Sequence, residues 1–363
     1  MNPFAAPHAT HSRCAPSFLA SLTVVVLVAF PTVTFADDAS RPAHRSWEAR
    51  PVVGTLTTAA AAPRCTPSEP LGNPDGFYWT DPFPRGEVVL TFDDGPHPAH
   101  TPRVLDLLAR HRLPATFFLV GRNISPETYP LVQRMVREGH TLGSHSYNHD
   151  VTMASRDQGE RTVAYVVAQH QSTQSLIEMA LLATSSEDFS GMFVRVFGGK
   201  GHRILSSADL RRGSRAFAAR HAELLRERSP DRRPYPILLS RPPGGNPYVG
   251  NAKPWQKRNY GAALERLGWL NVLWHGESGD TDPERRSDAA FLRENLRRKA
   301  QKGGVLLIHD YIRHDVLDAA VGEMVKDSGV RVVPIRRAVE RKFGCGAQEL
   351  RGALAVALGG EAP

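Results

Sequence analysis

The stretch Glu87-Val-Val-Leu-Thr-Phe-Asp-Asp-Gly-Pro96 decides how the chain folds. Its first six residues form a mostly apolar run that predicts a buried strand, and two carboxylates follow at once. Residues 102–111 then carry leucine and valine at helical spacing, and residues 115–120 form a second apolar run. Apolar strands that alternate with amphipathic helices indicate a parallel sheet covered on both faces.

The same alternation continues along the chain. Further strands are expected at 141–143, 236–239, 270–274, 305–308 and 330–333, and further helices at 126–138, 157–183, 260–267, 288–302 and 316–326. About seven such units would close into a barrel, so we predict a distorted (β/α) barrel over residues 85–345. Residues 185–234 break the rhythm with a segment rich in Gly, Arg and Ser, which we interpret as an insertion with one helix at 207–226.

The N-terminal residues have the pattern of a secretory signal. The apolar run 18–30 follows Arg13 and leads into Thr34-Phe35-Ala36, which predicts a signal peptide over 1–36. A run of this length is too short to cross a bilayer comfortably, so no membrane span is expected after cleavage; the alternative is an uncleaved anchor. We therefore expect a secreted, periplasmic or cell-wall-associated protein, with an N-terminal arm at 37–84 and a C-terminal tail at 346–363.

Composition narrows the class of protein. The 363 residues are 41% hydrophobic and 23% charged, which excludes collagen-like and wholly disordered chains. The net charge of +8 suits an anionic partner such as a cell wall or acidic glycan, although an arginine-rich bias spread over solvated faces would give the same figure. No compact basic run with interleaved aromatics is present, so no nucleic-acid partner is expected. Cys65 and Cys345 could pair in an oxidising compartment or remain as thiols, and the oligomeric state is not indicated.

Ionisable side chains follow five of the predicted strands. They are Asp93 and Asp94, His145 and His149, Arg241, Glu277 and Asp280, and His309 with Asp310. The carboxyl ends of parallel strands are where β/α folds assemble active sites. The pattern therefore predicts one site at this edge of the sheet.

The residue types in this set suggest a metal site. His145 and His149 could share one face of a helical turn and one metal ion, and Asp93-Asp94 supplies a carboxylate. Neighbouring side chains on an extended segment point to opposite sides, so one Asp could bind metal while the other acts as a base that Arg241 keeps ionised. Two imidazoles and one carboxylate leave coordination positions open, which favours a catalytic zinc site, although a non-haem iron oxygenase uses the same ligands.

A third histidine lies outside this ligand set. His309 would be free to protonate a leaving group, and Asp280 would orient it.

At these residues the sequence resembles the polysaccharide deacetylases, carbohydrate esterase family four, which carry the NodB homology domain. The motifs that carry the resemblance stand in order at Thr91–Pro96, His145–His149, Arg241–Gly245, Glu277–Thr281 and Leu307–His309. The resemblance implies a secreted, metal-dependent enzyme that removes N-acetyl groups from N-acetylglucosamine-type sugars in a peptidoglycan or chitin-like glycan, with Zn²⁺ or another divalent metal such as Co²⁺.

The resemblance also implies a role for each residue. Asp93 would be the general base, held by Arg241, and His309 the general acid, tuned by Asp280; Asp94, His145 and His149 would bind the metal. Pro243, Gly244 and Leu307 would contact the substrate, with the Gly244 amide at the oxyanion and Leu307 lining the acetyl pocket.

Three features depart from the family pattern. Gly244 stands where an aromatic residue is usual, Glu277 and Thr281 stand where Asp and Trp are usual, and the insertion lengthens the connection between the second and third motifs. These departures leave open an O-acetyl esterase of the xylan type and a catalytically degenerate glycan-binding protein.

Overall fold

A computed structural model describes residues 82–229, residue 235 and residues 239–343. All of them belong to one compact unit of the chain, Pro51–Pro363. The predicted signal peptide, most of the predicted arm, both Cys65 and Cys345, residues 230–234 of the predicted insertion and the C-terminal tail lie outside the described residues.

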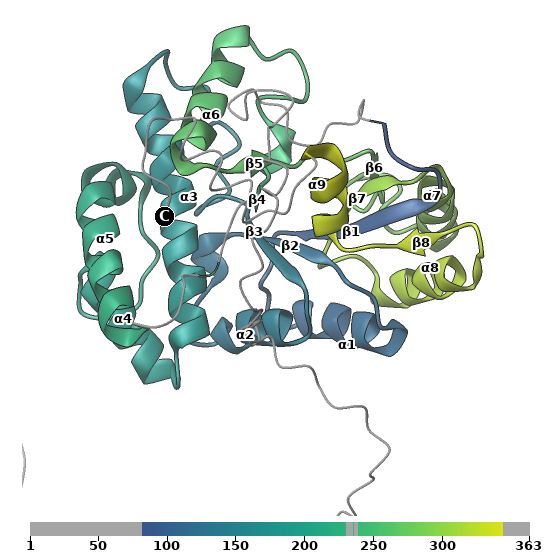
Figure 1. The fold of residues 1–363 in the computed structure, drawn as a ribbon, viewed down its shortest axis with the longest axis horizontal. Helices are drawn as coiled ribbons and strands as arrows, with labels where there is room; N and C mark the ends of the chain where they lie inside the picture. Colours follow the sequence, from purple (N-terminus) through teal and green to yellow (C-terminus); the bar gives the residue numbers. More distant parts are fainter. Residues whose placement is uncertain (1–81, 230–234, 236–238, 344–363) are drawn as a thin grey trace, which may run out of the picture. The chain divides into compact units, whose positions relative to one another are not determined.

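The strand that opens the first motif lies in the middle of the sheet. This strand, β1 (Glu87–Asp93), is buried along its whole length. It pairs in parallel with β2 (Thr116–Leu119) and β7 (Gly304–His309), and near its start also with β8 (Arg331–Val332). The row of strands is β5-β4-β3-β2-β1-β7-β6, and the remaining bounds are Thr141–Ser144 for β3, Leu239–Ser240 for β4, Leu270–Asn271 for β5 and Gly276–Glu277 for β6. This half-barrel of seven parallel strands surrounded by helices (Figure 1) confirms the predicted distorted (β/α) barrel.

The register of the strands brings their carboxyl ends to one level. Asp93, the last residue of β1, lies opposite His309, the last residue of β7. On the other side of β1, Ser144 at the end of β3 lies opposite Leu119 of β2 and Ser240 of β4. Residues that directly follow these strands therefore emerge at the same edge of the sheet.

Helices surround the sheet. Their bounds are Thr101–His111 for α1, Tyr129–Arg137 for α2, Pro254–Leu267 for α6, Ala289–Lys302 for α7, His314–Lys326 for α8 and Ile335–Phe343 for α9. In α1, Pro102 occupies the first turn, where no N–H is needed, while Val104, Leu105 and Leu108 are buried. Arg112 ends the helix in a left-handed conformation and donates its N–H to helix carbonyls.

Several helices begin at other residues than expected, and two of them show a physical reason. The helix expected at 126–138 begins at Tyr129, because the residues before it form a turn that the Thr128 hydroxyl closes. The helix expected at 260–267 begins already at Pro254, whose ring fixes a helical φ and whose missing N–H costs nothing in the first turn.

The strand expected at 270–274 is shorter than predicted. It ends at Asn271, and the carbonyls of Val272 and Leu273 accept hydrogen bonds from the Arg241 guanidinium. The buried Arg241 side chain thus binds two carbonyl groups that, in a longer strand, would accept hydrogen bonds from the neighbouring strand. Of the strand expected at 236–239, residues 236–238 lie outside the described residues, and β4 begins at Leu239.

The predicted insertion holds two helices rather than one. Both α4 (Ser186–Phe197) and α5 (Ser207–Arg228) pack against the long α3 (Glu160–Leu182), to the left in Figure 1. Helix α4 was missed, although Ser185 caps it by accepting a hydrogen bond from the Asp188 amide. Its buried side chains, Phe189, Met192, Phe193, Val196 and Phe197, recur at helical spacing, and that spacing was the available signal.

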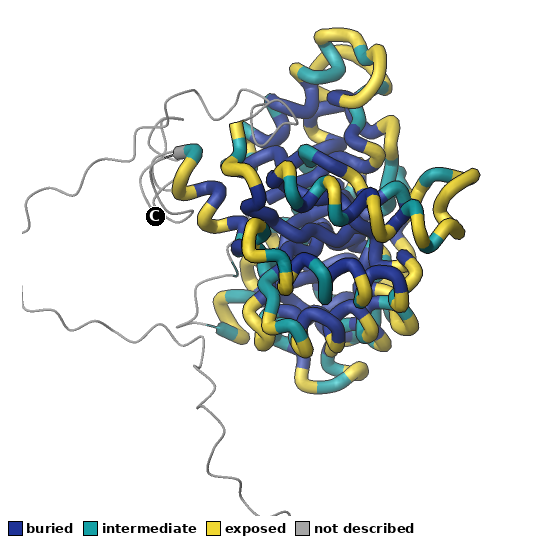
Figure 2. Tube along the Cα trace, turned by 90° about the vertical axis from the view of Figure 1, so that its right-hand side faces the viewer, coloured by how far each residue is buried: buried dark blue, intermediate teal, exposed yellow. Residues whose placement is uncertain are grey.

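Burial follows this layering. In Figure 2 the buried part of the trace runs through the interior of the described unit, and exposed residues gather on the outer turns of the helices. None of the helices in the described ranges combines the length and apolar character needed to span a bilayer.

Candidate active site

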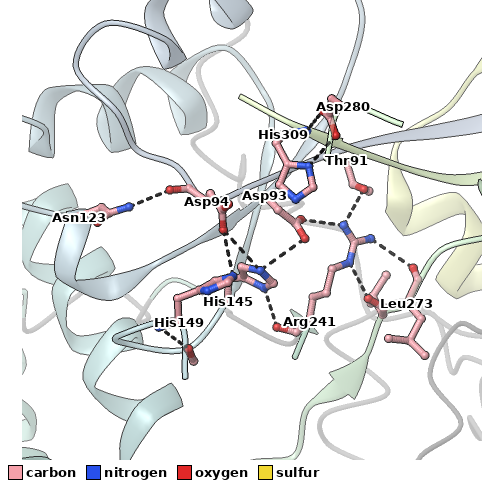
Figure 3. A network of polar contacts seen from close by, with 12 residues as sticks. Thr91, Asp93, Asp94, Asn123, His145, His149, Arg241, Leu273, Asp280 and His309 are labelled. Atoms are coloured by element: carbon pink, nitrogen blue, oxygen red, sulfur yellow. Dashed lines mark hydrogen bonds and ion pairs between the residues drawn. The ribbon is translucent and has the colours of Figure 1, made fainter. Parts of the chain in front are cut away.

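Asp93 and Asp94 both face the same site, which corrects the expectation that they point to opposite sides. Asp94 follows β1 with a left-handed backbone, φ 74°, so the alternation of an extended strand ends there. As a result Nε2 of His145 lies 3.6 Å from Oδ2 of Asp93 and 3.7 Å from Oδ1 of Asp94. Figure 3 shows the two carboxylates turned toward the same imidazole.

Asp94, His145 and His149 form a group that fits a metal ion. One ligand atom from each lies within 4.8 Å of the others, and Nε2 of His149 is 3.3 Å from Oδ1 of Asp94. Ligands about 2.1 Å from a tetrahedral ion lie about 3.4 Å apart, close to this separation. Oδ1 of Asp94 is buried and has no hydrogen-bond partner among the described residues, so an ion would supply what this atom lacks.

The two histidines lie in a loop, not on one face of a helical turn as expected. His145 directly follows β3, and the chain then passes through left-handed backbone at Ser146 (φ 66°) and His149 (φ 58°). These turns bring the two rings to a centroid separation of 5.0 Å. The i and i+4 spacing therefore singled out two rings that lie close together, and a loop rather than a helix brings them together.

The tautomer of His145 suits a metal ligand. Its Nδ1 lies 2.8 Å from the Arg241 carbonyl oxygen, which can only accept, so Nδ1 carries the proton and Nε2 is left with a free lone pair. Burial lowers the pKa of His145 to about 3, so the ring is neutral at physiological pH.

Arg241 and Asp93 form a buried ion pair. Nη1 of Arg241 lies 2.7 Å from Oδ1 of Asp93, and the side chains are 0% and 3% exposed. The remaining guanidinium donors bind the Thr91 hydroxyl and two carbonyls of the chain after β5, and the guanidinium lies 4.2 Å from the centre of the Phe118 ring. Burial raises the pKa of Asp93 above its ordinary value, while the Arg241 charge and hydrogen bond oppose the rise.

His309 is held by Asp280 on the other side of Asp93. The Asp280 carboxylate accepts from Nδ1 of His309 at 2.9 Å and from its backbone N–H at 2.8 Å. Burial alone would lower the pKa of His309. The hydrogen bond and charge of Asp280, together with the charges of Asp93 and Asp94, outweigh burial and raise that pKa to about 9. Nε2 of a protonated His309 is therefore free to donate toward the site (Figure 3).

The three predicted substrate contacts lie on the segments that carry Arg241 and His309. Pro243 is buried and Gly244 is exposed, in a single helical turn over Pro243–Gly245 where Gly244 has φ 59°. A side chain at Gly244 would be strained by this backbone, and its Cβ would lie 3.7 Å from Val151. Leu307 is buried in β7, opposite Thr91 of β1.

The structure also brings in residues that the sequence analysis missed. Asn123 donates a hydrogen bond to the Asp94 carbonyl at 2.8 Å. Tyr311 stacks on the His309 ring with a centroid separation of 5.0 Å, and it remains 43% exposed. An aromatic residue two positions after a predicted catalytic histidine was the available signal for Tyr311. Nothing local in the sequence pointed to Asn123.

Comparison with known proteins shows that part of the chain is similar to carbohydrate-modifying enzymes. Residues 80–186 match the polysaccharide deacetylase family model. The chain is 46% identical over 74 residues to a peptidoglycan-N-acetylglucosamine deacetylase of Bacillus cereus, covering 20% of this chain and 26% of that protein. It is 48% identical over 77 residues to a chitooligosaccharide deacetylase of Sinorhizobium fredii, covering 21% and 35%. A solved carbohydrate esterase family four structure from Streptococcus mutans superposes with a TM-score of 0.48 at 23% identity, covering 69% of this chain and 86% of that one.

The matched part of the chain spans about a quarter to two fifths of the length of these curated relatives. The match to the family model contains the first two motifs, Thr91–Pro96 and His145–His149, and so Asp93, Asp94 and both imidazoles that converge in the structure. Residues 80–186 therefore carry a polysaccharide deacetylase domain.

Proposed function

We propose that the chain is a secreted, metal-dependent hydrolase that removes N-acetyl groups from N-acetylglucosamine-type sugars in a polysaccharide. One observation carries the proposal: a metal-binding group, a carboxylate paired with a buried arginine, and an imidazole paired with a carboxylate meet at one edge of the sheet. The relatives named as deacetylases of peptidoglycan N-acetylglucosamine and of chitooligosaccharides support this class of substrate.

Asp94, His145 and His149 would hold a divalent ion, Zn²⁺ or a similar metal such as Co²⁺. Nitrogen and carboxylate ligands with open positions suit a catalytic zinc site. When bound, such an ion polarises the acetyl carbonyl and lowers the pKa of a water molecule.

The other residues would move the protons of the reaction. Asp93, whose ionised form the Arg241 charge favours, accepts a proton from the attacking water. The oxygen of that water forms a bond to the acetyl carbon. The bond from that carbon to the sugar nitrogen breaks, and protonated His309 gives its Nε2 proton to the departing amine. The products are acetate and a glucosamine unit, so the atoms of one water molecule are accounted for.

Three further residues are proposed to position the acetyl group. The Gly244 amide would donate to the oxyanion, Leu307 would pack against the methyl group, and Pro243 would shape the turn that carries Gly244. Gly244 itself is exposed, so a substrate could reach its backbone.

The place of action rests on the predicted signal peptide, residues 1–36, and on the basic charge of the chain. Both agree with a secreted, periplasmic or cell-wall location and with a glycan as partner.

The test is acetate release by the purified protein. We expect acetate from N-acetylglucosamine oligomers and peptidoglycan in the presence of Zn²⁺ or Co²⁺ and none after chelation, with most of the rate lost in Asp93→Asn and His309→Ala. Release from acetylated xylan alone would replace the proposal with an O-acetyl esterase. Glycan binding without acetate release from any substrate would indicate a degenerate binding protein, and full activity of Asp93→Asn would overturn the assignment of the base.

A further inference from the structure

The loop that carries the two proposed histidine ligands has an unusual backbone. Between His145 and His149 the chain bends through left-handed conformations at Ser146 (φ 66°) and again at His149 (φ 58°). Residues with a side chain seldom adopt such angles, and they keep them only where the surroundings hold them. The positions of the imidazoles therefore depend on what contacts this loop from outside.

Neighbouring elements of the barrel bind the backbone of the loop. The amides of Tyr147 and Asn148 both donate to Oε1 of Gln169 on α3, at 2.9 and 3.2 Å. The carbonyls of Ser146 and Tyr147 accept from the amides of Gly121 and Arg122, at 3.0 and 2.8 Å. The peptide groups of the loop are thus held from two sides.

Two side chains of the loop, those of Tyr147 and Asn148, reach the segment predicted as an insertion, and Asn148 Oδ1 also accepts from Nε2 of Gln169 at 2.7 Å. The buried Tyr147 hydroxyl accepts a hydrogen bond from the Leu205 amide at 2.8 Å. Nδ2 of Asn148 donates to Oγ of Ser207 at 3.2 Å. The Tyr165 hydroxyl lies 2.9 Å from that same Oγ and 3.0 Å from the Asp150 carboxylate, just beyond the loop.

The residues that make these contacts are themselves fixed by the two helices of the insertion. Leu205 is buried, and Ser206 caps α5 by accepting from the Asp209 amide while the Asp209 carboxylate accepts in return. The Phe197 ring of α4 contacts the Phe217 ring of α5 at a centroid distance of 5.1 Å. The junction between α4 and α5 is therefore a rigid support.

We propose that the described part of the insertion, residues 185–229, positions the metal-binding loop, with Leu205 and Ser207 as the contacts that hold Tyr147 and Asn148 and, through them, His145 and His149. The proposal rests on the proposed function, because it concerns the ligands of the proposed metal. Ser207 is a positioning residue: it acts through Asn148 and Tyr165, and its loss changes the affinity for metal rather than removing a ligand.

The test is the zinc affinity of the metal-free full chain, measured by competition with a chromogenic chelator. Loss of a residue that orients metal ligands typically weakens metal binding about 10- to 100-fold. We therefore expect about tenfold weaker binding in Ser207→Ala and in Tyr147→Phe. Ser190→Ala is the matched control, since that hydroxyl bonds only to the Ser186 carbonyl within α4.

A second pair of variants separates positioning from folding. Ser207→Thr keeps the hydroxyl and Ser207→Val does not, although the two side chains have nearly the same shape. We expect Thr to keep an affinity close to that of the unaltered chain and Val to lose about tenfold, at equal melting temperatures of the metal-free proteins. Affinities within twofold for Ala, Val and Tyr147→Phe would overturn the proposal while leaving the deacetylase assignment intact. Failure of the unaltered chain to bind zinc at all would overturn both.

Discussion

Replacing Asp280 with asparagine tests the electrostatics of the site. The Asp280 carboxylate accepts both the Nδ1–H and the backbone N–H of His309. Burial alone would lower the pKa of His309, and Asp280 is the main reason that it rises from 6.5 to about 9. That difference corresponds to about 3 kcal/mol in favour of the protonated ring.

Asparagine has the shape of aspartate without its charge. Its amide NH2 would face one of the two N–H groups of His309 that the Asp280 carboxylate accepts from. We therefore expect the pKa of His309 in Asp280→Asn to fall to about 6.5 or lower, because burial is then opposed only by Asp93 and Asp94. If protonated His309 is the general acid, the rate should fall about 30-fold at pH 8 and less than about twofold at pH 6.

The assay is kcat/KM for acetate release from a chitin oligomer between pH 5.5 and 10, together with an NMR titration of the histidine rings. The alkaline limb should lie near pH 9 in the unaltered chain and move toward neutrality in Asp280→Asn. Glu277→Gln is a matched control, because Glu277 is an exposed carboxylate at the end of β6, three residues before Asp280. An alkaline limb at the same pH in Asp280→Asn would refute the reasoning, whatever the loss in rate.

The same pair predicts a pH dependence of stability. The folded-state pKa of His309, about 9, exceeds the unfolded value of 6.5, so the stabilisation is fully present below about pH 6.5 and is lost as the pH rises through 9. In urea unfolding, Asp280→Asn should therefore lose up to about 3 kcal/mol at pH 6, and the difference from the unaltered chain should shrink toward pH 9.5.

Three other substitutions probe separate parts of the site. Arg241→Met should lower the free energy of unfolding at pH 7 by about 3–5 kcal/mol, because it leaves the Asp93 carboxylate buried without its counter-charge. In urea unfolding, the double variant with Asp93→Asn should lose less free energy of unfolding than Arg241→Met alone, and equal losses would refute this reasoning. His149→Ala should weaken zinc binding by more than about 100-fold in the chelator competition, and an unchanged affinity would remove His149 from the metal site. Tyr311→Ala should raise KM about three- to tenfold with little change in kcat if the exposed ring stacks on the sugar, whereas Tyr311→Phe should keep KM; a loss confined to kcat would argue instead for a role through His309.

The sequence predicted the barrel and the edge at which its site lies, because both follow from local patterns. A short apolar run such as 87–92 is typical of a buried strand, and in a parallel sheet the polar residues after each strand emerge at a common edge. The pairing of Asp93 with Arg241, 148 positions apart, followed from the same rule. Helix α4 was missed although its apolar spacing was present in the sequence.

Two features were out of reach for such reasoning. The left-handed turn at Asp94, which points both carboxylates into the site, occurs at a residue for which an extended backbone is the ordinary expectation. The contacts from Leu205 and Ser207 to the His145–His149 loop join residues about 60 positions apart, and no periodicity marks either partner. Both arise from tertiary packing, which fixes backbone angles and hydrogen bonds that local sequence leaves open.

The two buried histidines of the site show how one side chain acquires opposite chemistry. Nδ1 of His145 contacts a neutral carbonyl oxygen, so burial prevails, and the pKa falls to about 3. Nδ1 of His309 contacts a carboxylate, so the charge prevails over burial, and the pKa rises to about 9. Across the physiological range one ring therefore offers a lone pair and the other a proton, although Asp93 lies beside both. The partner of Nδ1 thus suits His145 to the proposed role of metal ligand and His309 to the proposed role of acid.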